Sequence, residues 1–174
     1  MAGGDIVLRF VYPANNANAD WRTIQINQVI EGSDNPIEMY KFHHPATGLS
    51  TGVTSMERKN LVTQRWENAG HIEWLSDYNA NVYFGIERVP MRELRRSKKA
   101  SSKSRRFKAA GAEYKWKLAE NGTDLICVST RGKAVATWSQ DTLVLRVAER
   151  AEGFLDRVVV TCILNLWARR MNFW

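Results

Sequence analysis

The sequence is poor in residues that build covalent or metal-bound frameworks. It has two cysteines and three histidines in 174 residues. Disulfide scaffolds and zinc sites need more Cys or His ligands at short, regular spacing. Cys127 and Cys162 both lie in apolar runs and are interpreted as small buried hydrophobic residues. His43 and His44 are adjacent, so on a strand they would point to opposite faces and could not share one ion. We expect no metal and no other cofactor.

Membrane-spanning and export segments are also missing. The most apolar stretch, 158–168, is about half as long as the ~20 residues that a transmembrane helix needs. The N-terminus has no basic-then-apolar leader, and Ala2 excludes N-myristoylation. We therefore expect an intracellular protein, cytoplasmic or nuclear, with no transmembrane segment.

Signatures of catalysis are missing as well. The sequence has no phosphate-cradling glycine loop, no nucleophile elbow and no zinc-ligand spacing. Cys127 has no neighbouring basic motif that would lower the pKa of its thiol. Four carboxylates fall in different predicted strands, with no spacing that forces any two together: Glu57, Glu67, Glu73 and Glu87. We assign no catalytic residue and expect a protein that is not an enzyme.

The C-terminal stretch is the strongest positive signal. Its apolar residues surround a narrow polar stripe of side chains that recur every four positions: Arg157, Thr161, Asn165 and Arg169. This spacing predicts a helix over 153–170 that other elements enclose on most sides. Arg169 and Arg170 would then lie in its last turn, where cations suit the helix dipole. A buried strand is the alternative, because residues 158–161 are β-branched.

The polar stripe admits two interpretations. Side chains buried at the centre of a fold need hydrogen-bond partners. Strand backbone or carboxylates of the surrounding wall would supply them in the first interpretation. In the second, the stripe lines a polar channel or a ligand cavity.

The rest of the chain alternates between apolar and polar residues in short segments separated by turn signals, of which Asn121-Gly122 is the clearest. Many short strands are typical of a sandwich or a barrel, and a wide barrel needs a filler. We predict one mostly β domain over 1–174, an antiparallel barrel of about 12 strands enclosing the C-terminal helix. The predicted strands are 5–12, 23–30, 37–42, 52–58, 61–67, 71–75, 82–86, 106–109, 113–118, 124–129, 134–138 and 142–148.

Positive charge is concentrated in 92–108, while the net charge of the whole chain is +7. Nine cations face one carboxylate, Glu93: Arg92, Arg95, Arg96, Lys98, Lys99, Lys103, Arg105, Arg106 and Lys108. A flexible, solvated loop between strands is one interpretation. The others are contact with anionic lipid, a nuclear-import signal, or nucleic-acid binding. Phe107 is the one aromatic residue in the segment, and stacking with bases would call for more.

Two resemblances follow from these patterns. Twelve strands followed by an apolar C-terminal helix resemble the tubby C-terminal fold, shared by LURP-one-related proteins and phospholipid scramblases. That resemblance implies a helix threaded through a closed barrel, and lipid or phosphoinositide binding.

A second resemblance rests on particular residues of the second half of the chain. The pieces are His71-Ile72-Glu73-Trp74, Arg105-Arg106-Phe107 with Gly111 and Tyr114-Lys115-Trp116, and Leu155-Asp156 before Val158-Val159-Val160-Thr161. In order and spacing, 60–168 resembles an uncharacterised domain family common in mushroom-forming fungi. Such a family implies no catalytic residues.

We therefore expect a non-catalytic intracellular binding module of unknown ligand, docking on anionic lipid or phosphoinositide through the nine cations of 92–108. The alternative is a nuclear or nucleic-acid-associated protein that uses the same cations.

Overall fold

The computed structural model describes residues 4–13 and 20–174, and it is built from twelve strands and three helical segments. The strands are β1 (Ile6–Val11), β2 (Ile24–Gln28), β3 (Ile37–His43), β4 (Gly52–Asn60), β5 (Arg65–Ser76), β6 (Asn79–Phe84), β7 (Glu87–Pro90), β8 (Arg105–Ala109), β9 (Ala112–Leu118), β10 (Leu125–Ser129), β11 (Ala134–Ser139) and β12 (Val144–Val147). The helical segments are α1 (Met91–Leu94), the 3-10 helix η1 (Glu149–Phe154) and α2 (Leu155–Arg170).

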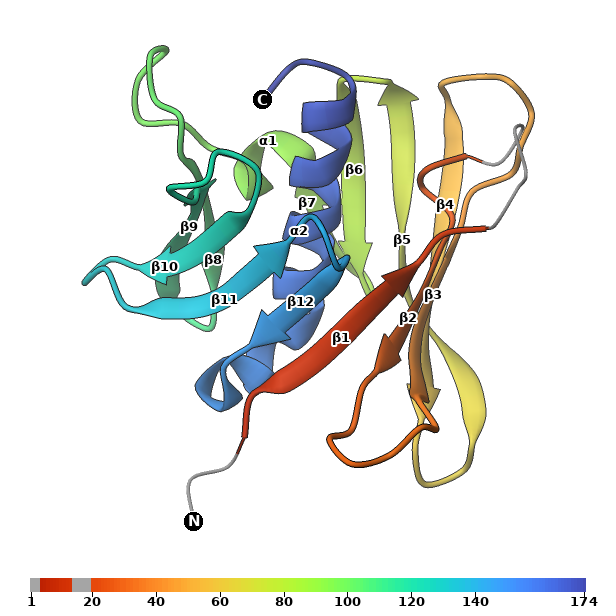
Figure 1. Cartoon of the computed structure of the whole chain (residues 1–174). Coiled ribbons are helices and arrows are strands. Elements are labelled where there is room, and N and C mark those ends of the chain that lie inside the picture. Colours follow the sequence, from red (N-terminus) through yellow and green to blue (C-terminus); the bar gives the residue numbers. More distant parts are fainter. Residues whose placement is uncertain (1–3, 14–19) are drawn as a thin grey trace.

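All twelve strands form one antiparallel sheet in the order β7-β6-β5-β4-β3-β2-β1-β12-β11-β10-β9-β8. Strands adjacent in the sequence are neighbours in the sheet, apart from the β7–β8 step, and the β1–β12 pair joins the two halves. The sheet curls so that its halves stand on either side of α2 (Figure 1). The predicted antiparallel β architecture with a C-terminal helix is confirmed.

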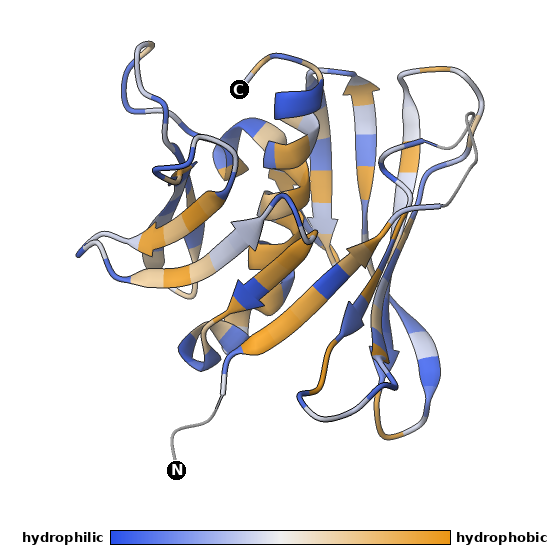
Figure 2. Cartoon of the chain, in the orientation of Figure 1, coloured by the Kyte–Doolittle hydropathy of each residue, from blue (hydrophilic) through white to orange (hydrophobic). Residues whose placement is uncertain are grey.

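The helix is confirmed over Leu155–Arg170, and the strand alternative for residues 158–161 is wrong. Eleven helix residues are buried, and Figure 2 shows α2 as a largely apolar rod between the sheet halves. Alternate strand residues, such as Leu8 and Phe10 of β1, are buried in the same core. A strand presents every second residue to one face, which is why the alternating pattern predicted these strands.

The predicted closure into a barrel is not confirmed. Among the described residues the edge strands β7 and β8 do not pair with each other. The chain turns into α1 directly after Pro90, and α1 contacts β6, β7 and β8 while burying Met91 and Leu94. Between α1 and β8, an isolated antiparallel bridge joins Arg96 to Arg106 of β8. A helical turn therefore fills the place that a closing strand pair would occupy.

The strand count agrees with the prediction through two errors that cancel. Residues 65–67 of the predicted strand 61–67 and the whole of the predicted strand 71–75 belong to one strand, β5, and β7 was missed. Gly70, which falls between these two predicted strands, is inside β5 with a φ of +144°. A Cβ there would lie 1.8 Å from the Tyr83 carbonyl oxygen, so only glycine permits this strand approach. The turn lies instead at 61–64, where the Asn60 side chain accepts backbone N–H bonds.

Candidate functional site

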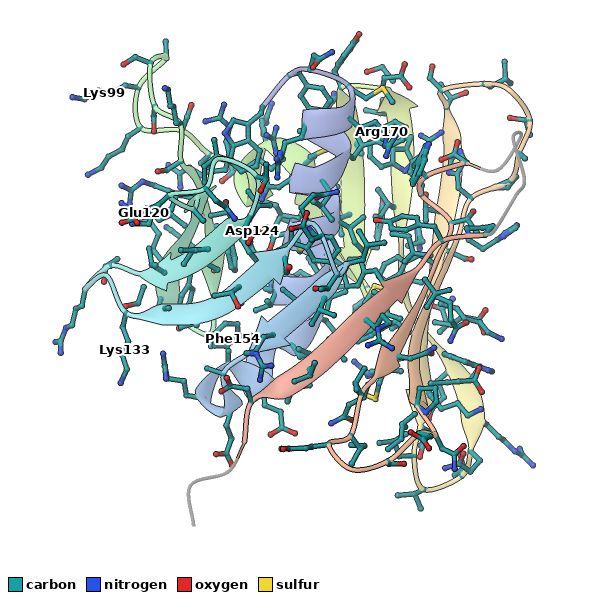
Figure 3. All side chains as sticks on the ribbon, in the orientation of Figure 1. Lys99, Glu120, Asp124, Lys133, Phe154 and Arg170 are labelled. Carbon is teal, nitrogen blue, oxygen red and sulfur yellow. The ribbon has the colours of Figure 1, made fainter. Side chains whose placement is uncertain are left out.

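The structure divides the nine cations of the basic segment into two groups. Six are exposed: Arg92, Arg96, Lys98, Lys99, Lys103 and Lys108. The other three are half-buried: Arg95, Arg105 and Arg106. The ends of the segment belong to α1 and β8, so a loop in the narrow sense covers only 97–104. Lys99 extends from this loop, away from the sheet (Figure 3).

Arg95 points inward to the end of α2. Its Nε donates to the Asn165 Oδ1 at 2.7 Å, and its guanidinium lies 5.2 Å and 5.6 Å from the ring centroids of Phe173 and Trp174. Burial, helped by the charge of Arg105, lowers the pKa of Arg95 to about 10. Arg95 therefore packs toward the interior and is less accessible than the exposed cations of the segment.

Arg105 shapes the base of the loop. Its guanidinium donates to the carbonyl oxygens of Ser102 and Ser104 at 2.8 Å and 3.0 Å. Trp174 packs against Arg105 and donates its indole N–H to the Lys103 carbonyl at 2.9 Å. The chain after α2 is thus fastened to the basic loop.

Two further cations have carboxylate neighbours, since Arg96 lies 3.9 Å from Glu93 and Arg106 lies 4.0 Å from Glu113. Among the cations of the described segment 92–108, five exposed ones have no carboxylate within salt-bridge distance: Arg92, Lys98, Lys99, Lys103 and Lys108. Three of them, Lys98, Lys99 and Lys103, share the 97–104 loop. This lysine trio is the part of the loop that is free to meet an anionic partner, and Arg92 and Lys108 are free cations outside the loop.

Each member of the polar stripe of α2 has a partner in the wall, but only the Glu87 carboxylate and the Thr123 carbonyl are of the kinds that the first interpretation named. Arg157 donates to the Glu87 carboxylate at 2.8 Å, and the Trp116 indole N–H donates to the Thr161 hydroxyl at 2.8 Å. The Arg95 guanidinium donates to the Asn165 Oδ1 at 2.7 Å, and Arg169 donates to the Thr123 carbonyl at 2.7 Å. The stripe therefore fixes the rotation of the helix inside the sheet.

A cavity of about 590 Å³ opens at the C-terminal end of α2, beside β1, β2, β11 and β12. Its wall includes Trp21, Trp138 and Trp167, together with the guanidiniums of Arg169 and Arg170. Of the residues that line it, the sequence singled out Arg169, in the polar stripe and at the helix end, and Arg170 at the helix end. Nothing in the sequence linked either arginine to Trp21.

The same end of the molecule carries exposed apolar side chains. Trp21 is 47 % exposed, Leu49 65 % and Tyr78 62 %. Because neighbouring strands are antiparallel, the segments before β2 and β4 and the β5–β6 turn all lie at the end where α2 terminates (Figure 1). The 97–104 loop rises at this end too. We call this surface the α2 C-terminal end.

The surroundings of His44, Cys127 and Cys162 are those of buried side chains. His44 is buried with its Nδ1 2.9 Å from the Thr54 hydroxyl, while His43 is exposed. Burial raises the pKa of the thiols of Cys127 and Cys162, which keeps them protonated. Within 4–13 and 20–174, no three His, Cys, Asp or Glu residues are grouped so that they could hold a metal ion. No helix in those residues is both long and apolar enough to cross a membrane.

Comparison with known proteins identifies a family. Residues 22–171 match the model of a family described as a family of unknown function (DUF6593). No curated protein and no solved structure matches the chain.

Proposed function

The chain belongs to this family of unknown function, and we propose that it is a non-catalytic intracellular binding module that docks on anionic membrane lipid. One observation carries the proposal. The lysine trio lies at the same end of the molecule as the exposed side chains of Trp21, Leu49 and Tyr78. An end that is both cationic and apolar suits a lipid surface, which offers anionic headgroups above an apolar layer.

The energetics of the two contributions favour docking. Each Lys near an anionic leaflet contributes ~1 kcal/mol of attraction, which salt screens. Trp and Tyr are enriched at membrane interfaces because their rings are apolar and their N–H or O–H groups stay hydrated. Leu49 adds apolar area that gains by leaving water. Three lysines alone would bind weakly, and the apolar side chains supply the part of the affinity that salt does not remove.

The surroundings of the loop disfavour nucleic acid as the partner. Single-stranded nucleic acid is bound by cations interleaved with aromatic side chains that stack on bases. The aromatic residue within the basic segment, Phe107, is fully buried. Trp174, which neighbours the loop, is engaged by Arg95, Arg105 and the Lys103 carbonyl.

The tubby-like relationship belongs to this proposal as well. A helix flanked by both halves of a twelve-stranded antiparallel sheet supports it. The α1 turn between β7 and β8 is where this chain departs from a closed barrel.

Vesicle flotation tests the proposal. Vesicles of phosphatidylcholine alone are compared with vesicles containing phosphatidylserine or a phosphoinositide, with Lys98→Gln/Lys99→Gln beside the unaltered chain. The matched control is Arg131→Gln/Lys133→Gln, which removes two cations from the β10–β11 turn, away from the 97–104 loop (Figure 1). We expect binding to anionic vesicles that the loop variant loses and the control retains.

Two outcomes overturn the proposal. The first is that the unaltered chain fails to float with every anionic vesicle. The second is that it binds RNA or DNA, and not vesicles, in a way that the loop variant abolishes, which would support the nucleic-acid alternative.

A further inference from the structure

We infer that the cavity at the C-terminal end of α2 binds a small amphipathic organic acid, with an apolar body and one carboxylate. This site is distinct from the lysine trio, and it does not depend on membrane docking. The inference rests on the volume of the cavity, on the residues of its wall, and on which of its three guanidiniums are paired with a carboxylate.

The wall suits a flat or extended apolar body. Most of it is contributed by apolar and aromatic side chains, including Tyr12, Trp21, Trp138, Leu166 and Trp167. A volume of about 590 Å³ lies within the range of sites that enclose small organic ligands, ~300–1,000 Å³. Aromatic rings in such a wall bury a large apolar area against a ligand and lose little side-chain entropy, because they have few rotatable bonds.

One of the three guanidiniums in the wall is already neutralised. Arg22 makes a two-pronged contact with Asp20 at 2.8 Å and 2.7 Å and donates to the Ser50 carbonyl at 3.0 Å. Its guanidinium also lies between the rings of Trp74 and Trp167, 4.9 Å and 4.4 Å from their centroids. Arg22 is therefore part of the wall and does not select a charged ligand.

The other two guanidiniums have no such counter-charge. In the described part of the chain neither Arg169 nor Arg170 has a carboxylate within salt-bridge distance, and no Asp or Glu lines the cavity. The Arg170 guanidinium carbon lies 3.4 Å from the Trp21 ring centroid. Arg169 donates one N–H to the Thr123 carbonyl, which leaves its other donors for a ligand. Two positive charges thus border a mostly apolar space.

Arg169 and Arg170 do not cap the C-terminus of α2 by hydrogen bonds. Helix ends leave carbonyl oxygens without partners, and basic side chains often cap them. Here the carbonyls of Trp167, Ala168 and Arg169 accept backbone N–H groups from 171–173 instead, at 2.9–3.2 Å. Neither guanidinium is therefore needed to cap the helix. Apart from the one N–H that Arg169 donates to Thr123, their donors are available, and the fork of a guanidinium matches a carboxylate in geometry.

The test uses the full chain and soluble ligands, so no vesicle is involved. Isothermal titration calorimetry measures binding of naphthoate and of decanoate, an aromatic and an aliphatic carboxylate. Their neutral counterparts, naphthamide and decanamide, keep the apolar body and remove the charge. We expect at least one acid to bind and its amide to bind at least about tenfold more weakly. Which of the two acids binds better identifies the class of apolar body.

Matched variants locate the site. Arg169→Gln/Arg170→Gln is expected to weaken acid binding about tenfold or more, while Arg131→Gln/Lys133→Gln leaves it unchanged. Arg170→Gln alone is the second variant, since Arg170 is exposed and its replacement spares the helix packing. A thermal melt of each variant verifies folding.

Three results overturn the inference. They are the absence of heat from either acid at about 1 mM, equal affinity for an acid and its amide, and unchanged affinity in both arginine variants. Failure here leaves the vesicle experiment unaffected, because the lysine trio is intact in every variant of this series. Loss of vesicle binding in Lys98→Gln/Lys99→Gln likewise leaves acid binding intact.

Discussion

The Tyr40 hydroxyl donates a 2.6 Å hydrogen bond to the Asp156 carboxylate and so joins strand β3 to the first turn of α2. Arg58 of the neighbouring strand β4 donates to the other oxygen of the same carboxylate. The anionic Asp156 also suits the positive end of the helix dipole. Two strands of the sheet thereby hold the helix at its N-terminal end, as Arg95 and Thr123 hold it further along.

Tyr40→Phe is expected to lower the free energy of unfolding by about 1–3 kcal/mol, because hydrogen bonds to charged groups contribute ~1.5–3 kcal/mol and Arg58 remains. Urea unfolding measures the change. Tyr78→Phe is the matched control, since Tyr78 is 62 % exposed, and it should differ little from the unaltered chain. Equal stabilities of the two variants would contradict a structural role for the Tyr40–Asp156 bond.

Alkaline pH is expected to destabilise the fold through the same tyrosine. Burial, and then the charge of Asp156, raises the pKa of Tyr40 well above 10.0. The unfolded chain loses the phenol proton near pH 10 while the folded chain retains it. This contribution to stability is therefore complete below about pH 10 and is lost as the pH rises further. Melting temperatures between pH 8 and about pH 11 should fall less steeply for Tyr40→Phe; parallel curves would contradict this.

Leu164→Asp is expected to abolish cooperative unfolding. Leu164 is fully buried in α2, and an unpaired carboxylate there costs at least about 3–5 kcal/mol, a large part of the stability of a small domain. Leu49→Asp makes the same change at a side chain that is 65 % exposed and should melt like the unaltered chain. A thermal melt followed by circular dichroism distinguishes them. A folded, cooperatively melting Leu164→Asp would refute the central position of α2.

Gly70→Ala is expected to destabilise the protein by at least about 2 kcal/mol more than Gly132→Ala. Both glycines have positive φ, at +144° and +80°, so both substitutions strain the backbone. Only at Gly70 would the added methyl collide with backbone, 1.8 Å from the Tyr83 carbonyl, whereas Gly132 has open space. Urea midpoints measure the difference, and similar midpoints would show that β5 and β6 can separate freely.

Local pattern was enough to predict α2 and most of the strands, because burial on one face imposes its period on the sequence. Pattern failed where a contact distant in sequence decided the conformation. Gly70 is typical of a turn when the sequence is considered alone. In the structure a glycine is required there because the Tyr83 carbonyl on β6 leaves no space for a Cβ. The four residues of β7 carry too little alternation to be noticed, and the α1 turn that interrupts closure follows from how Met91 and Leu94 pack.

The candidate sites likewise have features that are visible in the sequence and features that only the fold reveals. The cluster of charge in 92–108 is visible in the sequence, but the inward turn of Arg95 depends on Asn165, far along the chain. The juxtaposition of Arg170 and Trp21 exists only once the first and last elements meet. Composition therefore located the lysine trio, whereas the cavity required the fold.

The orientation of the protein on a membrane yields the last prediction. If the α2 C-terminal end faces the lipid, Leu49→Ser/Tyr78→Ser removes apolar contacts and should weaken binding to anionic vesicles about tenfold. The remaining binding should be more sensitive to salt, because charge then supplies most of it. Val62→Ser/Ile86→Ser is the matched control, since Val62 and Ile86 are 93 % and 101 % exposed in turns at the opposite end. Flotation at two salt concentrations measures both effects. Loss of binding in the control variant instead would indicate that the opposite end of the molecule faces the membrane, and would contradict docking through the lysine trio.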